Sequence, residues 1–520
     1  MRGDTLQISV SMIVYMTVVI GIGLYFAKRA NESSENYFLG GRSLGPLVTA
    51  MSAEASDMSG WLLMGLPGVA YWYGLSDAVW TAIGLAAGTY LNWLFIAKRL
   101  HNYSVAAGNS ITLPDFFSNR FKEKNKIIMT ISAVFILVFF TVYASSCFVT
   151  VGKLFNALFG FKYQYMMILG AAFVLFYTYI GGFLAETASD TMQAFVMIIA
   201  LVTILIVGTA AAGGAASVIE NAKSIPGFFE FFGIASPKVT DGVQQVVNGV
   251  PQYNAKGVYG LYTVLSTLAW GLGYFGMPQV LLRFMAIRNP DELKTSRRIA
   301  SVWVVISLGA AVAIGIIGKA IFPAELLTYS DSENIFVVLS SNLLPALLAG
   351  FVMAGILAAT ISSSDSYLLI AASAFSKNIY QHLIKKDATD RQVMNISRII
   401  LVVISIIGIF IALDENSVIF TIVSFAWAGF GATFGPITIF SLFWKRTTNE
   451  GAIAGMLSGA IMVFVWKLIL KPMGGFFGVY ELLPAFIVSC IFIFAVSKIT
   501  SPPSEEILQE FEMVRKQTRE

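Results

Sequence analysis

The chain has 520 residues, of which 57% are hydrophobic and only 12% are charged, and its formal net charge is +4. A soluble core does not need so much apolar sequence, so the composition indicates an integral membrane protein and gives no sign of a nucleic-acid-binding surface. The two cysteines, Cys147 and Cys490, lie in apolar runs and offer neither a disulfide framework nor a metal-binding spacing.

Apolar runs of about twenty residues recur along the chain, and each is long enough to cross a bilayer as a helix. They predict an all-α protein with about 13 transmembrane helices, in a single transmembrane domain over residues 1–500. A short charged tail over 501–520 follows, either as a helix or without order. The predicted spans lie near residues 7–27, 47–72, 75–97, 127–157, 165–183, 192–213, 257–280, 299–322, 337–370, 396–413, 417–443, 451–470 and 482–499. The run over 337–370 is too long for one span, and Pro345 predicts a short outer helix before the span itself.

Basic residues gather in every second loop between these spans. Examples are Lys98 after the third span, Arg283 and Arg297 after the seventh, and Lys385 after the ninth. The positive-inside rule then places the N-terminus outside and the C-terminus in the cytoplasm.

The second span contains the sequence SAEASDMSGWLLMGLPG, from Ser52 to Gly68, with two carboxylates among small residues. A carboxylate at membrane depth costs roughly 2.5–3.5 kcal/mol on insertion scales, so Asp57 is expected to serve a function. The small residues around it favour a broken helix that exposes carbonyl groups, which indicates an ion and substrate site. Glu54 lies one turn earlier, and we expect it to be a neutral, hydrogen-bonded or pore-lining acid.

The ninth span contains LAATISSSDSYLL, from Leu357 to Leu369, in which hydroxyl groups follow small residues. Hard cations such as Na⁺ take oxygen ligands, so Ser362, Ser363 and the carbonyl of Ala359 form a candidate ion site. Packing between helices through small polar residues is the alternative explanation. Asp365, near the cytoplasmic end, could equally be a solvated residue.

The seventh span contains WGLGYFGMP, from Trp270 to Pro278, with two aromatic residues four positions apart. We expect Trp270 and Tyr274 to form one wall of a substrate pocket, since an aromatic face suits a small cationic amine; simple aromatic packing is the alternative. The second and seventh spans are both interrupted by small residues and lie five helices apart. This spacing suggests two inverted repeats, at about 47–213 and 257–443, although glycine is common in membrane helices.

Two acids, Glu186 and Asp190, follow the fifth span in YIGGFLAETASDTMQ. They are expected in a loop at the cytoplasmic face. They could belong to an inner gate, or they could be salt-bridge partners of Arg42.

The chain resembles the sodium/solute symporter family, and within it the bacterial members that take up proline. The resemblance rests on long motifs that extend over nearly the whole membrane domain. They are LGGRSLGP (Leu39–Pro46), the Ser52–Gly68 sequence, FFTVYASS (Phe139–Ser146), YIGGFLA (Tyr179–Ala185), WGLGYFGMP, RFMA (Arg283–Ala286) and AWAGFGATFGP (Ala426–Pro436).

This resemblance implies a leucine-transporter-type fold with an inverted five-plus-five core, and Na⁺-coupled uptake of L-proline by alternating access. It implies no cofactor, Na⁺ as the only metal ion, and no obligate protein partner. The expected location is the plasma membrane of a bacterium. The residues that match functional positions of the family are, for sodium, Ala55, Met58, Ala359, Ser362 and Ser363, with Asp57 as the sodium-linked acid; for substrate, Trp61, Gly65, Tyr143, Trp270, Tyr274 and Pro278; and for gating or coupling, Arg42, Asp190 and Glu333.

Two positions depart from the family pattern. Ser363 stands where relatives often have threonine, which keeps the ligand oxygen. Glu54 stands where relatives often have a small or amide residue, which adds an acid beside the expected ion site.

Other functions fit the sequence less well. A different small amino or organic acid of the same family is the alternative substrate. An ion channel would need a continuous polar path, which the closed aromatic segment opposes. An enzyme is not expected, because no nucleophile set, zinc motif or GxSxG is placed to support one.

Overall fold

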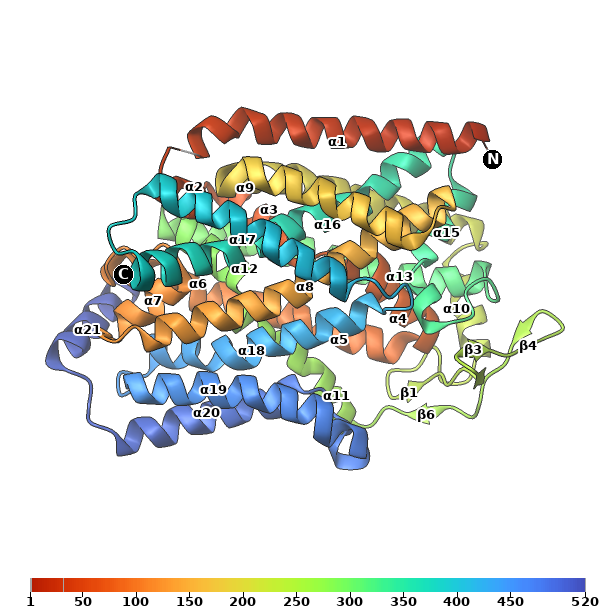
Figure 1. Ribbon diagram of the computed structural model, residues 1–520. Helices are drawn as coiled ribbons and strands as arrows, with labels where there is room; N and C mark the ends of the chain where they lie inside the picture. Colours follow the sequence, from red (N-terminus) through yellow and green to blue (C-terminus); the bar gives the residue numbers. More distant parts are fainter. Residues whose placement is uncertain (1, 31, 520) are drawn as a thin grey trace.

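The computed structural model describes residues 2–30 and 32–519, and it is built mainly of long helices that lie side by side (Figure 1). Most of the helices run along a common direction, so the bundle has two ends. The C-terminal helix lies at one end, and the short strands lie at the other. Ten helices in the described part are long and apolar enough to cross a membrane, in agreement with the predicted class.

Along the chain, one set of helices precedes the short strands and a second set follows them. The first set is α1 (Arg2–Ala30), α2 (Ser34–Leu39), α3 (Pro46–Asp57), α4 (Leu66–Tyr73), α5 (Leu75–Leu91), α6 (Ala97–Ala106), α7 (Leu113–Arg120), α8 (Ile127–Phe159), α9 (Tyr163–Ala211) and α10 (Ala215–Ser224). The second set is α11 (Leu261–Leu268), α12 (Pro278–Ala286), α13 (Leu293–Ile321), α14 (Tyr329–Ser332), α15 (Ile335–Leu343), α16 (Ala346–Ser373), α17 (Asp390–Ile411), α18 (Ile419–Phe443), α19 (Asn449–Val465), α20 (Leu482–Ile499) and α21 (Glu505–Arg519).

Short turns of other helix types join or extend these helices. The π-helical turns are η2 (Trp61–Gly65), η3 (Asn92–Ile96), η6 (Ala374–Ile384) and η7 (Trp466–Leu470). The 3₁₀ turns are η1 (Gly40–Arg42), η4 (Ala269–Gly276), η5 (Pro290–Glu292), η8 (Lys471–Met473) and η9 (Gly475–Gly478).

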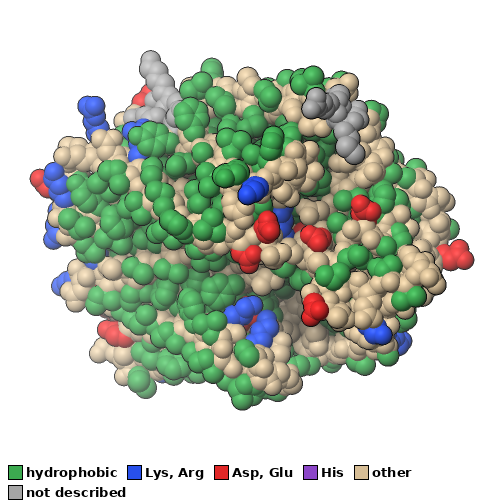
Figure 2. Space-filling model, turned by 45° about the vertical axis from the view of Figure 1, so that its right-hand side comes forward, with side chains coloured by type: hydrophobic (Ala, Val, Ile, Leu, Met, Phe, Trp, Pro, Cys, Tyr) green, Lys and Arg blue, Asp and Glu red, His purple; other side chains and the backbone are tan. Residues whose placement is uncertain are grey.

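Helix α16 lies at the centre of the bundle and α1 at its edge. In the apolar stretch of α16, 78% of the residues are buried, against 22% in α1. Helix α1 exposes large apolar side chains such as Leu6 and Ile13, which in water would be costly. Figure 2 shows hydrophobic side chains over wide parts of the surface, as expected for helices that face lipid.

The remaining three predicted spans coincide with interrupted helices. They correspond to α3–η2–α4, to the first part of α9, and to α11–η4–α12. A short helix does precede the ninth predicted span, because α15 ends at Leu343 and α16 begins directly after Pro345. In the tail, the helical alternative is the one observed, since α21 continues to Arg519.

The boundary between the fifth and sixth predicted spans was placed wrongly. Helix α9 has a single break at Gly182, whose φ of 64° and ψ of −178° lie outside the helical region. The chain then returns directly to helix. Glu186 and Asp190 therefore lie within helix α9, with buried side chains, and not in a cytoplasmic loop.

The first interrupted helix breaks where the sequence predicts it. Helix α3 ends at Asp57, Met58 leaves the helical region with φ −85° and ψ 76°, and the chain resumes as the π-helical turn η2. A Cβ on Gly60 would lie 2.2 Å from Thr150 Oγ1 of α8, so only glycine allows this close approach.

The second interruption has a different geometry. After α11 the chain tightens into the 3₁₀ helix η4, and Met277 is extended (φ −77°, ψ 109°) before Pro278 begins α12. Proline suits the first position of a helix, because its missing N–H would have no partner there. Gly271 in η4 packs against α5 so closely that its Cβ would lie 2.2 Å from the carbonyl oxygen of Gly84.

Three antiparallel strand pairs form in the polar segment between α10 and α11. They are β1 (Gly233–Ile234) with β6 (Gly257–Val258), β2 (Val239–Thr240) with β3 (Val243–Gln244), and β4 (Val246–Val247) with β5 (Val250–Pro251). Asp241–Gly242 and Asn248–Gly249 make the two tight turns, and all four residues have positive φ. Such dipeptides favour hairpin turns because both residues tolerate the left-handed region.

Candidate functional site

The break between α3 and η2 frees a carbonyl group that a continuous helix would use. Ser59 N–H donates to the carbonyl of Asp57 at 3.1 Å, so it does not close the usual helical bond to Ala55. Two hydroxyl groups of α16 point to that carbonyl instead. Ser362 Oγ lies 2.8 Å and Ser363 Oγ 3.2 Å from the oxygen of Ala55.

Ser362 also contacts carbonyls of its own helix. Ser362 Oγ lies 3.2 Å from the carbonyl oxygen of Ala359, which adds a further oxygen to the group. Both serines are fully buried. Four of the five residues expected to bind sodium are therefore in mutual contact. The fifth, Met58, is the residue at which α3 ends.

Asp57 is fully buried beside this group and is held by neutral donors. Tyr274 Oη donates to Asp57 Oδ2 at 2.7 Å, and Gln279 Nε2 donates to Oδ1 at 3.2 Å. Within the described residues, no lysine, arginine or histidine forms an ion pair with this carboxylate. The two interrupted helices thus meet at Asp57, because Tyr274 belongs to η4 and Gln279 to α12.

Glu54 is also buried, with a single donor. Trp93 Nε1 donates to its Oε1 at 3.3 Å, and Oε2 has no hydrogen-bond partner among the described residues. This agrees with the expectation of a hydrogen-bonded acid.

The aromatic residues expected in the substrate pocket lie around the same break. Trp61 Nε1 donates to the carbonyl of Asp57 at 3.2 Å. A Cβ on Gly65 would contact the Cβ atoms of Trp61 at 3.4 Å and of Phe420 at 3.5 Å. The ring of Tyr143, on α8, stacks on Tyr367 of α16 with a centroid distance of 4.2 Å.

Trp270 and Tyr274 do not form the continuous wall that their spacing predicts, because their rings point in different directions. In a 3₁₀ helix three residues make one turn, so positions four apart differ by about 120° around the axis. Tyr274 reaches Asp57, whereas Trp270 stacks on Tyr480 at 4.9 Å. Both rings still touch Trp427, with centroid distances of 6.1 Å for Trp270 and 5.0 Å for Tyr274.

Arg283 differs from its prediction as a cation of a cytoplasmic loop, because its guanidinium group is buried within the bundle. Its side chain has no exposed area and forms ion pairs with Glu186 and with Asp190, the second at 3.3 Å. It also donates to Ser52 Oγ at 3.1 Å and to Ser366 Oγ at 2.8 Å. This group, which we call the Arg283 cluster, joins α12 to α9, α3 and α16. The sequence feature that could have indicated this buried arginine is the RFMA motif, which places Arg283 one helical turn after Gln279.

Of the two alternatives for the acids of α9, a salt bridge with Arg42 is not the one formed, because both acids pair with Arg283. Arg42 lies in η1 and donates instead to Asn109 Oδ1, Ser104 Oγ and the carbonyls of Met285 and Ser110, at 2.6–3.1 Å. Burial lowers the pKa of Arg42 to about 10, so the group stays charged at neutral pH. It ties η1 to the loop after α6 and to the end of α12.

Glu333, the third residue expected in gating or coupling, caps the start of helix α18. It accepts hydrogen bonds from the backbone N–H groups of Ile419 and Phe420, at 2.9 and 3.0 Å, at the start of α18. Lys153 Nζ lies 2.8 Å from its Oε2. A carboxylate at a helix N-terminus is stabilised by the unpaired N–H groups there. Glu333 therefore fixes the position of Phe420.

Comparisons with known proteins give the family. A family model described as "Sodium:solute symporter family" matches residues 37–459. The sodium/proline symporters of Staphylococcus aureus strains USA300 / TCH1516 and JH9 are each 40% identical to this chain over 520 residues, covering 99% of it and 97% of the relative.

Solved structures share the fold at low sequence identity. A Na⁺-coupled sialic acid symporter in a substrate-bound, outward-open state matches with a TM-score of 0.77 and 17% identity, over 96% of this chain and 99% of that one. MhsT in complex with L-phenylalanine matches with a TM-score of 0.54 and 14% identity, over 86% of this chain and 98% of that one. The helical bundle is thus one that transporters use. On the extent of the family match and the identity to its members, this chain belongs to the sodium:solute symporter family.

Proposed function

We propose that this chain takes up L-proline together with Na⁺. The observation that carries the proposal is the 40% identity, over 99% of the chain, to proteins named as sodium/proline symporters. The contact between the Ala55 carbonyl and the hydroxyls of Ser362 and Ser363 supports it, because these are ligands that Na⁺ prefers.

Sodium would bind to the carbonyls of Ala55, Met58 and Ala359 and to the two hydroxyls. Without the ion, the hydroxyl protons point to the carbonyl oxygens. When Na⁺ enters, the hydroxyl groups turn so that their lone pairs face the ion. Asp57 has neutral donors only, so its negative charge remains available to favour the cation.

Proline would bind beside the break in α3, among Trp61, Gly65, Tyr143, Tyr274 and Pro278, with Trp270 on its outer side. Its carboxylate is suited to the free N–H groups near Gly60 and its ring to the aromatic faces. The hydrogen bond from Tyr274 to Asp57 would connect the substrate wall to the ion site, so each ligand would change the affinity for the other.

Transport would proceed by alternating access in a leucine-transporter-type core. The proposal includes 13 spans, with inverted repeats at about 47–213 and 257–443, the N-terminus outside and the C-terminus in the cytoplasm of a bacterium. Asp190 in the Arg283 cluster and Arg42 would hold the inner side closed, and Glu333 would hold the outer end of α18. The hydrogen bonds and ion pairs of these residues would break and form again as the helices move between the outward-open and inward-open states.

The decisive experiment is uptake of labelled L-proline by proteoliposomes that contain the purified protein. We expect accumulation against the proline gradient when Na⁺ is directed inward, and none when K⁺ replaces Na⁺. Uptake of proline that does not depend on Na⁺ would contradict the coupling. Na⁺-driven uptake of a different amino or organic acid, with proline neither transported nor competing, would favour the alternative substrate.

A further inference from the structure

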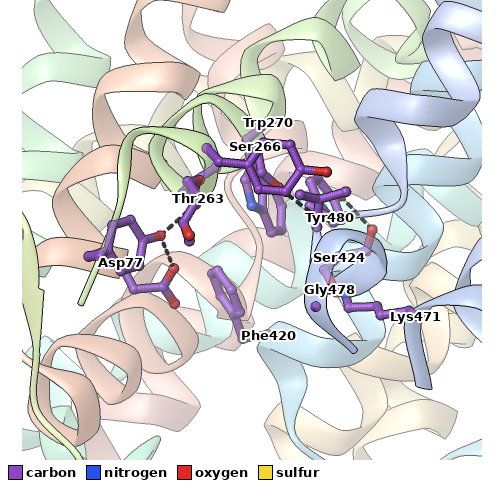
Figure 3. Close-up of a pocket in the computed structure, with 14 residues that line it drawn as sticks. Asp77, Thr263, Ser266, Trp270, Phe420, Ser424, Lys471, Gly478 and Tyr480 are labelled. Atoms are coloured by element: carbon purple, nitrogen blue, oxygen red, sulfur yellow. Dashed lines mark hydrogen bonds between the residues drawn. The ribbon is translucent and has the colours of Figure 1, made fainter. Parts of the chain in front are cut away.

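A cavity of about 330 Å³ lies beside Trp270 and is lined by residues that include Asp77, Ser266, Phe420 and Lys471 (Figure 3). Its walls come from α5, α11, α18 and the segment before α20. Trp270 and Phe420 form its floor, with ring centroids 5.1 Å apart. Phe420 in turn lies against Gly65, so this aromatic pair separates the cavity from the break in α3.

One end of the cavity carries an acidic side chain. Asp77, near the start of α5, accepts a hydrogen bond from Tyr259 Oη at 2.7 Å. That hydroxyl group also contacts Thr267 Oγ1 at 2.5 Å. The hydrogen-bond donor to Asp77 is therefore a neutral hydroxyl group, and Asp77 forms no salt bridge with the described residues. Figure 3 shows Asp77 at the opposite side of the cavity from Lys471.

The other end carries a positive excess. Lys471 Nζ lies 2.8 Å from Glu481 Oε2, and Lys467 Nζ lies 3.4 Å from the other oxygen of the same carboxylate. Two ammonium groups thus share one buried carboxylate. Lys471 lines the cavity and keeps a side chain that is 33% exposed.

The space between the two charged ends is aromatic, with hydroxyl groups at the sides. Tyr480 stacks on Trp270, and its backbone N–H donates to Ser266 Oγ at 2.7 Å. A compact zwitterion matches this arrangement, with its ammonium group at Asp77, its carboxylate at Lys471 and its apolar part on Trp270.

We propose that this cavity, which we call the outer site, binds a zwitterionic amino acid before it passes Trp270 and Phe420 to the break in α3. The inference rests on the proposed function, since it assumes that the transported solute is such a zwitterion. Displacement of the Trp270–Phe420 pair then admits the substrate. Glu333 holds the backbone of Phe420, so the hinge of this displacement lies at the start of α18.

Transport kinetics provide the first test, in proteoliposomes with labelled L-proline at saturating Na⁺. Asp77→Asn keeps an acceptor for Tyr259 but removes the charge, and Lys471→Gln removes the positive charge. We expect each to raise the KM for proline about tenfold, with the effect on KM and not on the maximal rate, as for loss of one charge-assisted hydrogen bond. Asp241→Asn and Lys238→Gln, in exposed positions of the strand segment, are matched controls and should leave KM unchanged.

Equilibrium binding provides the second test, and it does not depend on transport. In a Tyr274→Ala background, which impairs the inner pocket, weak binding of labelled proline should remain and should disappear when Asp77→Asn is added. Absence of residual binding, or residual binding that Asp77→Asn does not alter, would overturn the outer site. Wild-type protein that fails to accumulate proline with Na⁺ would instead overturn the proposed function, so the two failures are distinguishable.

Discussion

Two buried acidic regions of this protein lie about one turn apart along α3 and α12, and their carboxylates have different kinds of partner. In the Arg283 cluster, a guanidinium meets both Glu186 and Asp190. At Asp57, the hydrogen-bond donors to the carboxylate among the described residues are the hydroxyl of Tyr274 and the amide of Gln279. A buried charge with a partner stabilises a particular arrangement of helices, whereas a buried charge without one has affinity left for a mobile cation.

The largest effect is expected from removing the cation of the first region. Arg283→Gln leaves Glu186 and Asp190 buried without a counter-charge, which typically costs about 3–5 kcal/mol. We expect a lower midpoint of thermal unfolding in detergent and loss of proline uptake. Arg288→Gln is the matched control, because Arg288 is exposed and pairs only with Glu292. An unchanged midpoint in Arg283→Gln would remove the contrast between the two regions.

The second effect is expected from neutralising the acid of the other region. In Asp57→Asn the amide oxygen can still accept from Gln279 and the amide NH₂ can donate to the Tyr274 hydroxyl, so the substitution should not lower the unfolding midpoint. A charge within roughly 5–10 Å of a cation contributes about 1.5–3 kcal/mol at an effective dielectric constant near 20. The Na⁺ concentration for half-maximal uptake should therefore rise about tenfold to a hundredfold.

Glu54→Gln is the matched comparison for Asp57→Asn, since Glu54 lies one turn earlier and is equally buried. It should change the Na⁺ dependence of uptake much less. Equal shifts in the two variants would mean that both acids serve the ion, and wild-type Na⁺ dependence in Asp57→Asn would contradict the proposed role of Asp57.

A smaller effect is expected from the oxygen ligands beside Asp57. Ser362→Ala and Ser363→Ala each remove one hydroxyl, at a cost on the order of 1–3 kcal/mol in Na⁺ binding. Because linkage is reciprocal, proline affinity should fall at low Na⁺ and recover at saturating Na⁺. Ser364→Ala is a suitable control, since that hydroxyl bonds to Thr360 of its own helix. A loss of proline affinity that is equal at all Na⁺ concentrations would argue against sodium ligation.

The smallest effects should separate the two aromatic residues of η4. Tyr274→Phe removes the hydrogen bond to Asp57, worth about 0.5–1.5 kcal/mol, and should shift the concentration dependence of both Na⁺ and proline severalfold. Trp270→Phe keeps an aromatic ring beside Tyr480, and it should shift the dependence of uptake on the proline concentration but not on the Na⁺ concentration. Uptake assays that vary each solute separately distinguish these outcomes, and identical behaviour of both variants would restore the single wall predicted from the sequence.

The class of the protein and the residues that surround the break in α3 could be predicted from local sequence features. Long apolar runs can exist only as membrane helices, and an acid among small residues within such a run is costly enough to mark a site. The hydroxyl groups of Ser362 and Ser363 and the break after Asp57 could be predicted for this reason. The family resemblance added the partner carbonyls of Ala55 and Ala359.

Which charges pair, and how the interrupted segments turn, depends on long-range packing that no local pattern reveals. Arg283 could be counted as a loop cation because the partners of a buried charge come from helices far away in the sequence. The segment η4 is a 3₁₀ helix in which Gly271 packs closely on α5, a contact with a helix far away in the sequence. Gly182 likewise breaks α9 without a loop. Local sequence fixes the cost of burying a group, but only long-range packing supplies what offsets that cost.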